Sequence, residues 1–186
     1  MVDAVSNLFY VMPINGYVAL NMNAVAMIND AVGGVTVTVP EDMTQVDPSF
    51  AEGAAVTLTG DQALKFTRYR DTEKNFSNNS RMERQKQYLV NFMGQAVKAM
   101  KADMGLPVSL YQSLTDDMVT NLSLDRSVYL ATEAMDMHFT ADGIVSLKAK
   151  SKKGSVYDEV YVNDDALYDL IIQTFYIEEQ SEGESK

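Results

Sequence analysis

Strand-like runs alternate with helical patterns along this chain, and this alternation restricts the folds that the chain can adopt. Apolar residues recur at the spacing of one helix face in segments that are separated by Gly, Pro or polar stretches. These segments are 2–9, 23–32, 59–66, 80–104, 123–135 and 164–175. Between two of them, Val35, Val37 and Val39 alternate with polar residues, as in a strand with one buried face. The expected fold class is therefore α/β, a layered mixed sheet flanked by helices.

The ends of these elements are predicted from capping and turn residues. Asn23 is expected to cap the second helix, and Gly33-Gly34 to stop it, because glycine tolerates positive φ. Ser80 is followed by Glu83 at the spacing of a capping box, so a long helix is expected to begin there. Further strands are expected over 16–21, 144–150 and 156–162. The first of these is expected to be buried and to share a sheet with the valine strand.

The composition excludes several classes of function. The formal net charge of −11 disfavours binding to nucleic acid or anionic lipid, because both need a basic surface. The chain has no cysteine, so disulfides and thiol chemistry are excluded. No segment approaches the roughly 20 apolar residues of a membrane-spanning helix, and residues 1–10 lack the basic start of a secretory signal. The chain as given is expected to be soluble, and its one histidine, His138, to have a surface or structural role.

Four of the five arginines fall in one short segment of this acidic chain. Arg81 and Arg84 lie three residues apart, so they share a helix face in the first turn after the predicted Ser80 cap. Cations are unfavourable there unless an anion binds, because a helix N-terminus is already partly positive. We therefore expect Arg68, Arg70, Arg81 and Arg84 to converge on one anion-binding cleft, since arginine suits phosphate. Replacing Arg81 or Arg84 by alanine should then weaken anion binding and spare stability.

The alternative is a solvated face on which these arginines pair with Asp71, Glu73 and Glu83. The surrounding sequence favours the anion site. Three segments occur in order: Gly-Gly-Val at 33–35, Leu-Thr-Gly-Asp-Gln-Ala-Leu-Lys-Phe-Thr-Arg-Tyr-Arg at 58–70, and Arg-Met-Glu-Arg-Gln-Lys-Gln at 81–87. This series closely resembles the LytR-CpsA-Psr family, in which a Gly-Gly-Val strand precedes a Leu-x-Gly-x-x-Ala-Leu-x-Tyr-x-Arg-x-Arg segment and a Gly-Arg-x-x-Arg-Gln helix start. The resemblance continues weakly to Phe175-Tyr176.

Members of this family resemble phosphotransferases that move a glycopolymer from a polyprenyl-pyrophosphate carrier to peptidoglycan. The resemblance implies a head-group site of Arg68, Arg70, Arg81, Arg84, Gln85 and Gln62, with Arg68 and Arg81 acting in catalysis. The arginines would stabilise charge on the phosphoryl and leaving groups while a peptidoglycan sugar hydroxyl attacks, so no covalent nucleophile is implied. The carrier's chain would occupy an apolar tunnel. Candidates for its lining, if they are not ordinary core, are Met22, Met27, Leu89, Phe92 and Met93.

The resemblance also sets the expected organisation. Residues 1–177 correspond to the C-terminal portion of the family domain, and 178–186 is expected to be an acidic disordered tail. A membrane anchor and two aspartate-bearing strands are expected before Met1, so any Mg²⁺ is expected to have its ligands there and none is assigned here. The family implies a location on the extracytoplasmic face of a Gram-positive cell membrane, with teichoic acid or capsule polymer as cargo. The segment 77–80, Ser-Asn-Asn-Ser, departs from the family's Gly-Asp-x-Gly and lacks its carboxylate.

Two other functions stay open at this level. The same arginine site would hydrolyse the pyrophosphate if water replaced the sugar hydroxyl. Without the upstream strands, the chain would instead act as a noncatalytic module that binds anionic glycopolymer or lipid head groups. Turnover by the purified protein, with and without divalent metal, separates these alternatives.

Overall fold

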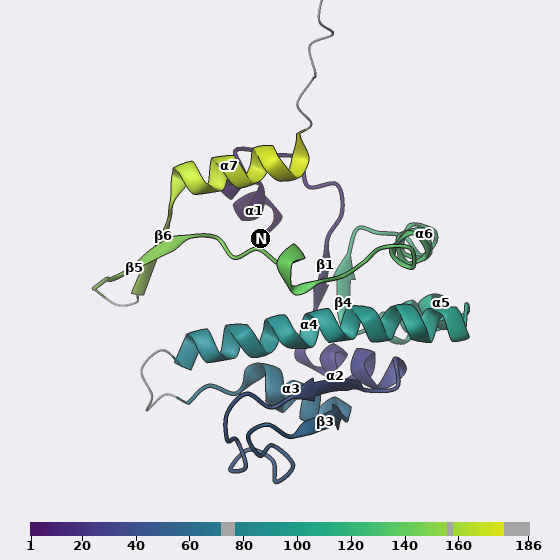
Figure 1. The fold of residues 1–186 in the computed structure, drawn as a ribbon. Helices are drawn as coiled ribbons and strands as arrows, with labels where there is room; N and C mark the ends of the chain where they lie inside the picture. Colours follow the sequence, from purple (N-terminus) through teal and green to yellow (C-terminus); the bar gives the residue numbers. More distant parts are fainter. Residues whose placement is uncertain (72–76, 156–157, 177–186) are drawn as a thin grey trace, which may run out of the picture. The chain divides into compact units, whose positions relative to one another are not determined.

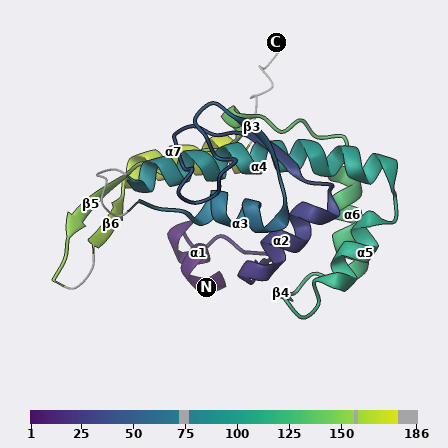
Figure 2. The same cartoon turned by 90° about the horizontal axis from the view of Figure 1, so that it is seen from below.

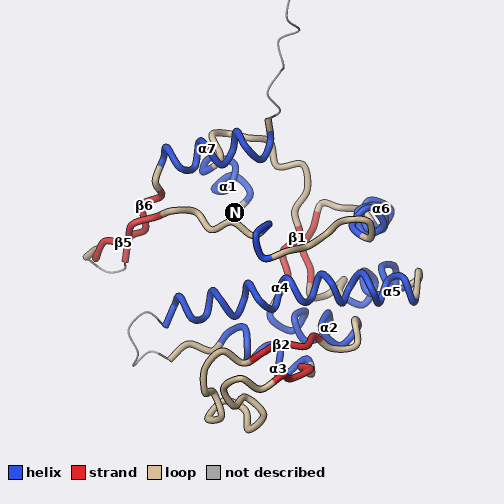
Figure 3. The backbone as a smooth tube through the Cα atoms, viewed as in Figure 1, coloured by secondary structure: helices blue, strands red, loops and turns tan. Residues whose placement is uncertain are grey.

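The computed structural model describes residues 1–71, 77–155 and 158–176. These residues form seven α-helices, one short 3-10 helix and six strands, so the predicted α/β class is confirmed (Figure 1). The described strands form three separate antiparallel pairs (Figure 3). The chain divides into two compact units, a larger one of Gly16–Ile144 and a smaller one of Met1–Asn15 with Val145–Lys186.

The larger unit places α4 against the end of α3. Its elements are β1 Val18–Leu20, α2 Met22–Ala31, β2 Val35–Thr38, β3 Ala55–Leu58, α3 Gly60–Arg68, α4 Ser77–Ala102, α5 Leu106–Ser113, β4 Met118–Thr120, α6 Leu124–Ala134 and the 3-10 helix η1 Ala141–Gly143. Helices α2 and α3 lie side by side (Figure 2). Helix α4 contacts both α3 and β2. The two segments that carry the clustered arginines are therefore neighbours in space.

The core of the larger unit forms between the β2–β3 pair, α3 and α4. Val35 and Val37 are buried while Thr36 and Thr38 are exposed, which confirms the predicted alternation. The buried cluster also contains Val32, Val39, Met43, Phe50, Leu58, Ala63 and Phe66, and α4 packs on it through Tyr88, Phe92, Ala96 and Ala99. Burial of these apolar side chains stabilises the unit and fixes the position of α4.

Helix α3 begins at a capping box. The Thr59 side chain accepts a hydrogen bond from the Gln62 backbone, and the Gln62 side chain accepts one from the Thr59 backbone. Gly60 lies in the first turn, where an added Cβ would be 2.7 Å from the backbone oxygen of Ala26 in α2. Because this distance is too short for a carbon, glycine is needed for α2 and α3 to approach so closely.

Two predicted helix starts differ from the structure. Asn21, not Asn23, caps α2: its side chain accepts hydrogen bonds from the backbone N–H groups of residues 23 and 24. Helix α4 begins at Ser77, so the prediction that Ser80 caps it is wrong. Serine and asparagine are only moderately unfavourable inside a helix, so local preference does not fix this boundary.

Strand β1 does not belong to the β2 sheet. It pairs with β4, with Val18 opposite Thr120. All three residues of β1 are exposed, so the prediction of a buried strand in one sheet with the valine strand is wrong. Strands β3 and β4 and helix α5 are absent from the sequence prediction. These elements are short and lack a clear period, and distant pairing rather than local preference decides whether such segments form strands.

The smaller unit contains α1 Val2–Leu8, β5 Ala149–Lys153, β6 Asp158–Val162 and α7 Asp164–Phe175. Helices α1 and α7 agree with the predicted segments 2–9 and 164–175. The Asn163 side chain caps α7 by accepting a hydrogen bond from the backbone N–H of Ala166. Strand β5 starts later than the predicted 144–150 and continues to Lys153, because pairing with β6 fixes its register.

Within the described residues, no helix combines the length and the apolar content needed to cross a bilayer. Residues 72–76, which include Glu73 of the predicted loop, lie outside the described part of the chain, as do residues 177–186. The loop before α4 and the disordered acidic tail therefore stay predictions.

Candidate functional site

Arg84 of α4 is buried, with 1% of its surface exposed. Its guanidinium is directed at the end of α3: Nε donates to the backbone oxygen of Phe66 at 3.0 Å, and Nη2 donates to that of Tyr69. Nη1 donates to a carboxylate oxygen of Glu41 at 2.7 Å. These partners are needed because a buried donor without a hydrogen bond destabilises the fold. Arg84 thus joins three separate segments of the larger unit.

These contacts form a C-terminal cap for α3 that is supplied by α4. The last carbonyl groups of a helix lack intrahelical partners, and Arg84 satisfies two of the oxygens near this end. Gln85 adds another contact, because its Nε2 donates to the backbone oxygen of Thr67 at 3.0 Å. The guanidinium carbon of Arg84 also lies 5.8 Å from the centre of the Tyr69 ring. Helix α4 therefore fixes the backbone on both sides of Arg68.

Arg84 and Arg81 lie within electrostatic range of each other. Burial lowers the pKa of Arg84 from its ordinary value, and the neighbouring Glu41 and Tyr69 oppose this change. The positive charge of Arg81 lowers the pKa of Arg84 further. Arginine stays protonated in proteins. The carboxylate of Glu41 supplies the negative charge that pairs with Arg84.

Gln62 is held by a second polar network on α3. Its Oε1 accepts from the backbone N–H of Thr59 at 3.0 Å, and its Nε2 donates to Ser49 Oγ at 3.1 Å and to Asp47 Oδ1 at 3.3 Å. Hydrogen bonds from the side chain and backbone of Ser49 hold the pKa of Asp47 below its ordinary range, with Gln62 and Lys65 adding to the effect. The amide of Gln62 is thus occupied by contacts within the protein.

The remaining predicted arginines are more accessible. Arg68 is the last residue of α3 and is exposed, Arg70 lies two residues further and is exposed, and Arg81 is half-buried in α4. Because α4 begins at Ser77, Arg81 belongs to the second turn, and its predicted place in the first turn is wrong. The convergence of the four arginines on one cleft stays a prediction.

A cavity of about 450 Å³ with a mixed lining opens beside the first half of α4. It is lined by Pro40, Glu83, Arg84, Lys86, Gln87, Val90, Asn91 and Ala141. Arg84 is thus the predicted site residue that lines this cavity. Arg68, Arg70, Arg81, Gln85 and Gln62 are not among its lining residues. Lys86 and Gln87 can contact a phosphate group there, whereas Glu83 adds a negative charge to the wall and the nitrogens of Arg84 donate to protein oxygens.

An apolar cavity of about 320 Å³ follows along α4. Its lining includes Leu89, Val90, Met93, His138, Phe139 and Ile144, so Val90 belongs to both cavities. Two tunnel candidates from the sequence, Leu89 and Met93, line it. Phe92 instead packs on the core, Met27 is half-buried, and Met22 is 43% exposed. His138 lies at this cavity, which the sequence does not indicate.

Sequence reasoning missed several cavity residues, which are Pro40, Lys86, Gln87, Val90, Asn91 and the segment 138–144. Lys86 and Gln87 occur inside the family-like segment 81–87, and their spacing from Glu83 and Val90 on one helix face could have indicated a shared lining. The segment 138–144 carries no periodic pattern that would place it beside α4. This segment contacts α4 through η1, and the contact joins residues that are far apart in the sequence.

The described residues hold no group of three or more His, Cys, Asp or Glu side chains that could bind a metal ion. The described residues 1–71, 77–155 and 158–176 therefore offer no such ligand set for the Mg²⁺ that the family resemblance implies.

Comparison with known proteins identifies relatives of this chain. The TagU protein of Bacillus cereus (strain AH820), a polyisoprenyl-teichoic acid–peptidoglycan teichoic acid transferase, is 52% identical over 62 residues, which are 33% of this chain and 20% of that protein. The transferase of the same name from Halalkalibacterium halodurans is 30% identical over 126 residues, 67% of this chain and 40% of that protein. The chain thus spans 20–40% of the length of these relatives.

Solved structures share the fold. The crystal structure of Bacillus subtilis TagV has a TM-score of 0.68 at 20% identity and covers 95% of this chain and 70% of that one. Bacillus subtilis TagU has a TM-score of 0.60 at 24% identity, with 92% and 68% covered. A structure of TagT bound to LI-WTA has a TM-score of 0.67 at 17% identity, with 92% and 63% covered. The model of the LytR_cpsA_psr family matches residues 1–173, and the chain belongs to this family.

Proposed function

We propose that this chain is part of a phosphotransferase that moves a cell-wall glycopolymer from a polyprenyl-pyrophosphate carrier to peptidoglycan. Family membership and the transferase activity named for the TagU relatives support the reaction class. The observation that carries the proposal is the pair of cavities on α4, one with charged and amide groups in its lining and one apolar, which share Val90 as a lining residue. A ligand with an anionic head and an apolar tail matches this pair.

The two cavities lie along one face of α4. Lys86, Val90 and Met93 are spaced i, i+4 and i+7, which places them on the same side of a helix. The wall changes along this face from basic and amide groups to apolar side chains. A pyrophosphate would bind at the Lys86 end, and the first prenyl units would bind against Met93 and Phe139. The arrangement suits a carrier lipid better than a free phosphate.

The proposed chemistry is direct displacement at phosphorus. A peptidoglycan hydroxyl oxygen forms a bond to the phosphorus that carries the glycopolymer, the bridging P–O bond breaks, and polyprenyl phosphate leaves while the hydroxyl proton passes to solvent. Arg68 and Arg81 are the proposed catalytic residues on the basis of the family pattern. Neither lines the two α4 cavities, so this role requires the phosphoryl group to extend beyond them towards the end of α3. The two arginines would stabilise the charge that develops on the phosphoryl oxygens and the leaving group. Arg84 and Gln85 act by holding the α3 end in place.

The proposed location is the extracytoplasmic face of the membrane of a Gram-positive bacterium, where carrier lipid and peptidoglycan meet. The proposed cargo is an anionic glycopolymer such as teichoic acid or capsule polymer. An anchor in the membrane and Mg²⁺ ligands would then belong to other parts of the full-length protein. Hydrolysis is the side reaction of the same site when water takes the place of the acceptor hydroxyl.

Calorimetric titration with farnesyl pyrophosphate tests the site. We expect it to bind more tightly than inorganic pyrophosphate or farnesol, because only the complete molecule occupies both cavities. Val90→Asp should weaken farnesyl pyrophosphate more than inorganic pyrophosphate, since a carboxylate at the junction repels both head groups but loses hydration only when the tail packs beside it. The matched control is Val119→Asp, at a position of β4 that is 66% exposed. Equal affinity for farnesyl pyrophosphate and pyrophosphate, unaffected by Val90→Asp, would reject the proposal.

A further inference from the structure

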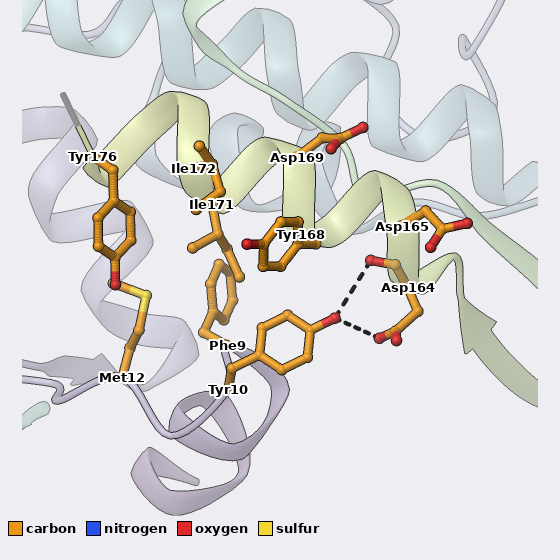
Figure 4. Close-up of a pocket in the computed structure, with 10 residues that line it drawn as sticks. All are labelled: Phe9, Tyr10, Met12, Asp164, Asp165, Tyr168, Asp169, Ile171, Ile172 and Tyr176. Carbon is orange, nitrogen blue, oxygen red and sulfur yellow. Dashed lines mark hydrogen bonds between the residues drawn. The ribbon is translucent and has the colours of Figure 1, made fainter. Parts of the chain in front are cut away.

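The smaller unit contains a cavity of about 750 Å³ between α7 and the turn that follows α1 (Figure 4). Its walls are aromatic and aliphatic, with Phe9, Tyr10, Met12, Tyr168, Ile171 and Tyr176 among the lining side chains. Asp164, Asp165 and Asp169 also line it. Figure 4 shows Tyr10 beside Asp164 at one end and Met12 beside Tyr176 at the other. The proposed transferase function uses none of these residues.

The tyrosine rings of this cavity are accessible to a ligand. Tyr10, Tyr168 and Tyr176 are 48%, 56% and 59% exposed, although each is packed on one side. The Tyr10 and Tyr168 rings meet edge to face, with centroids 6.2 Å apart and planes at 76°. Two rings at this angle form a corner, so a small group placed there contacts the face of one ring and the edge of the other.

The cavity carries negative charge only. Its lining includes three carboxylates and, among the described residues that form it, no Lys, Arg or His. The hydroxyl of Tyr10 donates to Asp164 Oδ1 at 2.6 Å. This hydrogen bond, with further effects of burial and of the charges of Asp164 and Asp165, raises the pKa of Tyr10 to about 12. An anionic ligand is therefore repelled, and a cation is attracted.

The turn that presents Tyr10 is held by hydrogen bonds despite an unfavourable backbone. Tyr10 and Val11 have φ values of 53° and 63°, and this region is strained for a β-branched residue. The Val11 N–H donates to the Ser6 backbone oxygen at 2.8 Å, and the Ser6 hydroxyl donates to that of Met12 at 2.7 Å. The ring of Tyr10 is thus placed against α7 before any ligand binds, which lowers the entropic cost of binding.

A structural explanation accounts for only part of these features. Asp164 and Asp165 lie in the first turn of α7, where carboxylates stabilise the helix dipole. This accounts for two of the acids. It does not explain why exposed aromatic rings surround them, or why Tyr10 is held in a strained turn to reach Asp164.

We propose that this cavity binds an organic ammonium group that carries an apolar body. The electron-rich face of one of the Tyr10 and Tyr168 rings attracts the cation, and the other ring contacts the apolar body of the ligand. Asp164, beside the rings, carries the nearest negative charge, and Asp165 and Asp169 on the neighbouring face of α7 add to the attraction. Met12 and Ile171 would contact the alkyl groups of the ligand. This site is separate from the α4 cavities in the residues that form it, and its existence does not depend on the transfer reaction.

Choline and its uncharged isostere 3,3-dimethylbutan-1-ol are the probes, because they have the same shape and differ in charge. Ligand-observed NMR titration of the full chain measures both affinities. We expect choline to bind and the isostere to bind more weakly. The two affinities should differ by at least about two- to five-fold, which is the contribution of one cation–π contact. Equal binding of the two probes, or no binding of choline to folded protein, overturns the proposal.

Single substitutions locate the bound probe. Asp165→Asn removes a charge without changing shape, and Tyr168→Ala removes one ring. Each should weaken choline by about two- to five-fold, and Asp165→Asn should leave the isostere unchanged. The matched controls are Asp116→Asn and Tyr129→Ala, which change an exposed acid and a 62% exposed tyrosine of the larger unit. If the controls weaken choline as much as the cavity variants do, the probe binds elsewhere and the proposal is wrong.

Discussion

Arg84 Nε and the backbone oxygen of Phe66 are 3.0 Å apart, and this hydrogen bond ties α4 to the end of α3. The contact has a different meaning from the one that the sequence suggests. An arginine in a phosphate-binding pattern is expected to face its ligand, whereas three of the nitrogen atoms of Arg84 donate to protein oxygens. Arg84 therefore positions the backbone around Arg68, whatever contact its remaining donors make.

Arg84→Met should destabilise the larger unit. The variant keeps an apolar stem but removes three donors and leaves Glu41 and two backbone oxygens without this partner, so we expect a loss of about 3–5 kcal/mol in the free energy of unfolding. Urea denaturation measures it, with the exposed Arg126→Met on α6 as control. This prediction replaces the sequence-based expectation that Arg84 substitutions spare stability. An unchanged unfolding midpoint would show that the buried contacts of Arg84 contribute little.

Arg68→Ala and Arg81→Ala should weaken farnesyl pyrophosphate binding. Each lost charge-assisted hydrogen bond should cost about 1.5–3 kcal/mol of binding free energy. Arg68 is exposed at the end of α3, so Arg68→Ala should change the free energy of unfolding by less than about 0.5 kcal/mol. Calorimetry gives the affinities, and Arg126→Ala controls for the loss of one positive charge. If Arg126→Ala weakens farnesyl pyrophosphate binding as much as the other two substitutions do, the loss reflects long-range attraction, and Arg68 and Arg81 do not contact the head group.

Gly60→Ala and Gly94→Ala should change stability in opposite directions. A Cβ at Gly60 would lie 2.7 Å from the Ala26 backbone oxygen, so α2 and α3 must move apart, at a cost of about 1–3 kcal/mol. A Cβ at Gly94 in α4 meets no atom within 4 Å. Alanine there should stabilise the helix by roughly 0.5–1 kcal/mol. Thermal unfolding of the two variants gives the comparison, and a stabilising Gly60→Ala would contradict the close packing of these helices.

Acid should weaken the loop that holds Gln62. Hydrogen bonds from Ser49 hold the pKa of Asp47 below its ordinary value, so its contribution to stability is complete above that ordinary value, about 3.9, and is lost as the pH falls below it. Ser49→Ala removes the largest cause and should raise the pKa of Asp47, which NMR titration of its carboxyl carbon measures. Ser113→Ala, an exposed serine of α5, is the control. An unchanged pKa of Asp47 in Ser49→Ala would show that another group sets it.

The sequence predicts those elements whose signals are local. The alternation of Val35, Val37 and Val39 predicts β2, and the glycines at 33 and 34 have the positive φ values that a helix stop requires. The segment 59–66 predicts α3. In each case the residues that determine the structure are close together in the chain.

The sequence does not predict features that depend on distant partners. The pairing of β1 with β4 and the segment 138–144 beside α4 are fixed by contacts between residues far apart in the chain. The same applies to Arg84, because nothing near it in sequence shows that Glu41 and the α3 carbonyl groups take up its donors. The residue types indicate the candidate site, but the tertiary structure determines which of its side chains hydrogen-bond to other protein groups.

The hydrogen bond between Tyr10 and Asp164 joins residues that are 154 positions apart. The smaller unit is therefore assembled from segments that flank the larger unit in the sequence, and Tyr10 meets its partner only once α7 has been synthesised. On the ribosome, the larger unit has all its residues available before the smaller one does. Closing such a long loop carries a large entropic cost, so the order of synthesis favours folding of the larger unit before the segments that flank it come together.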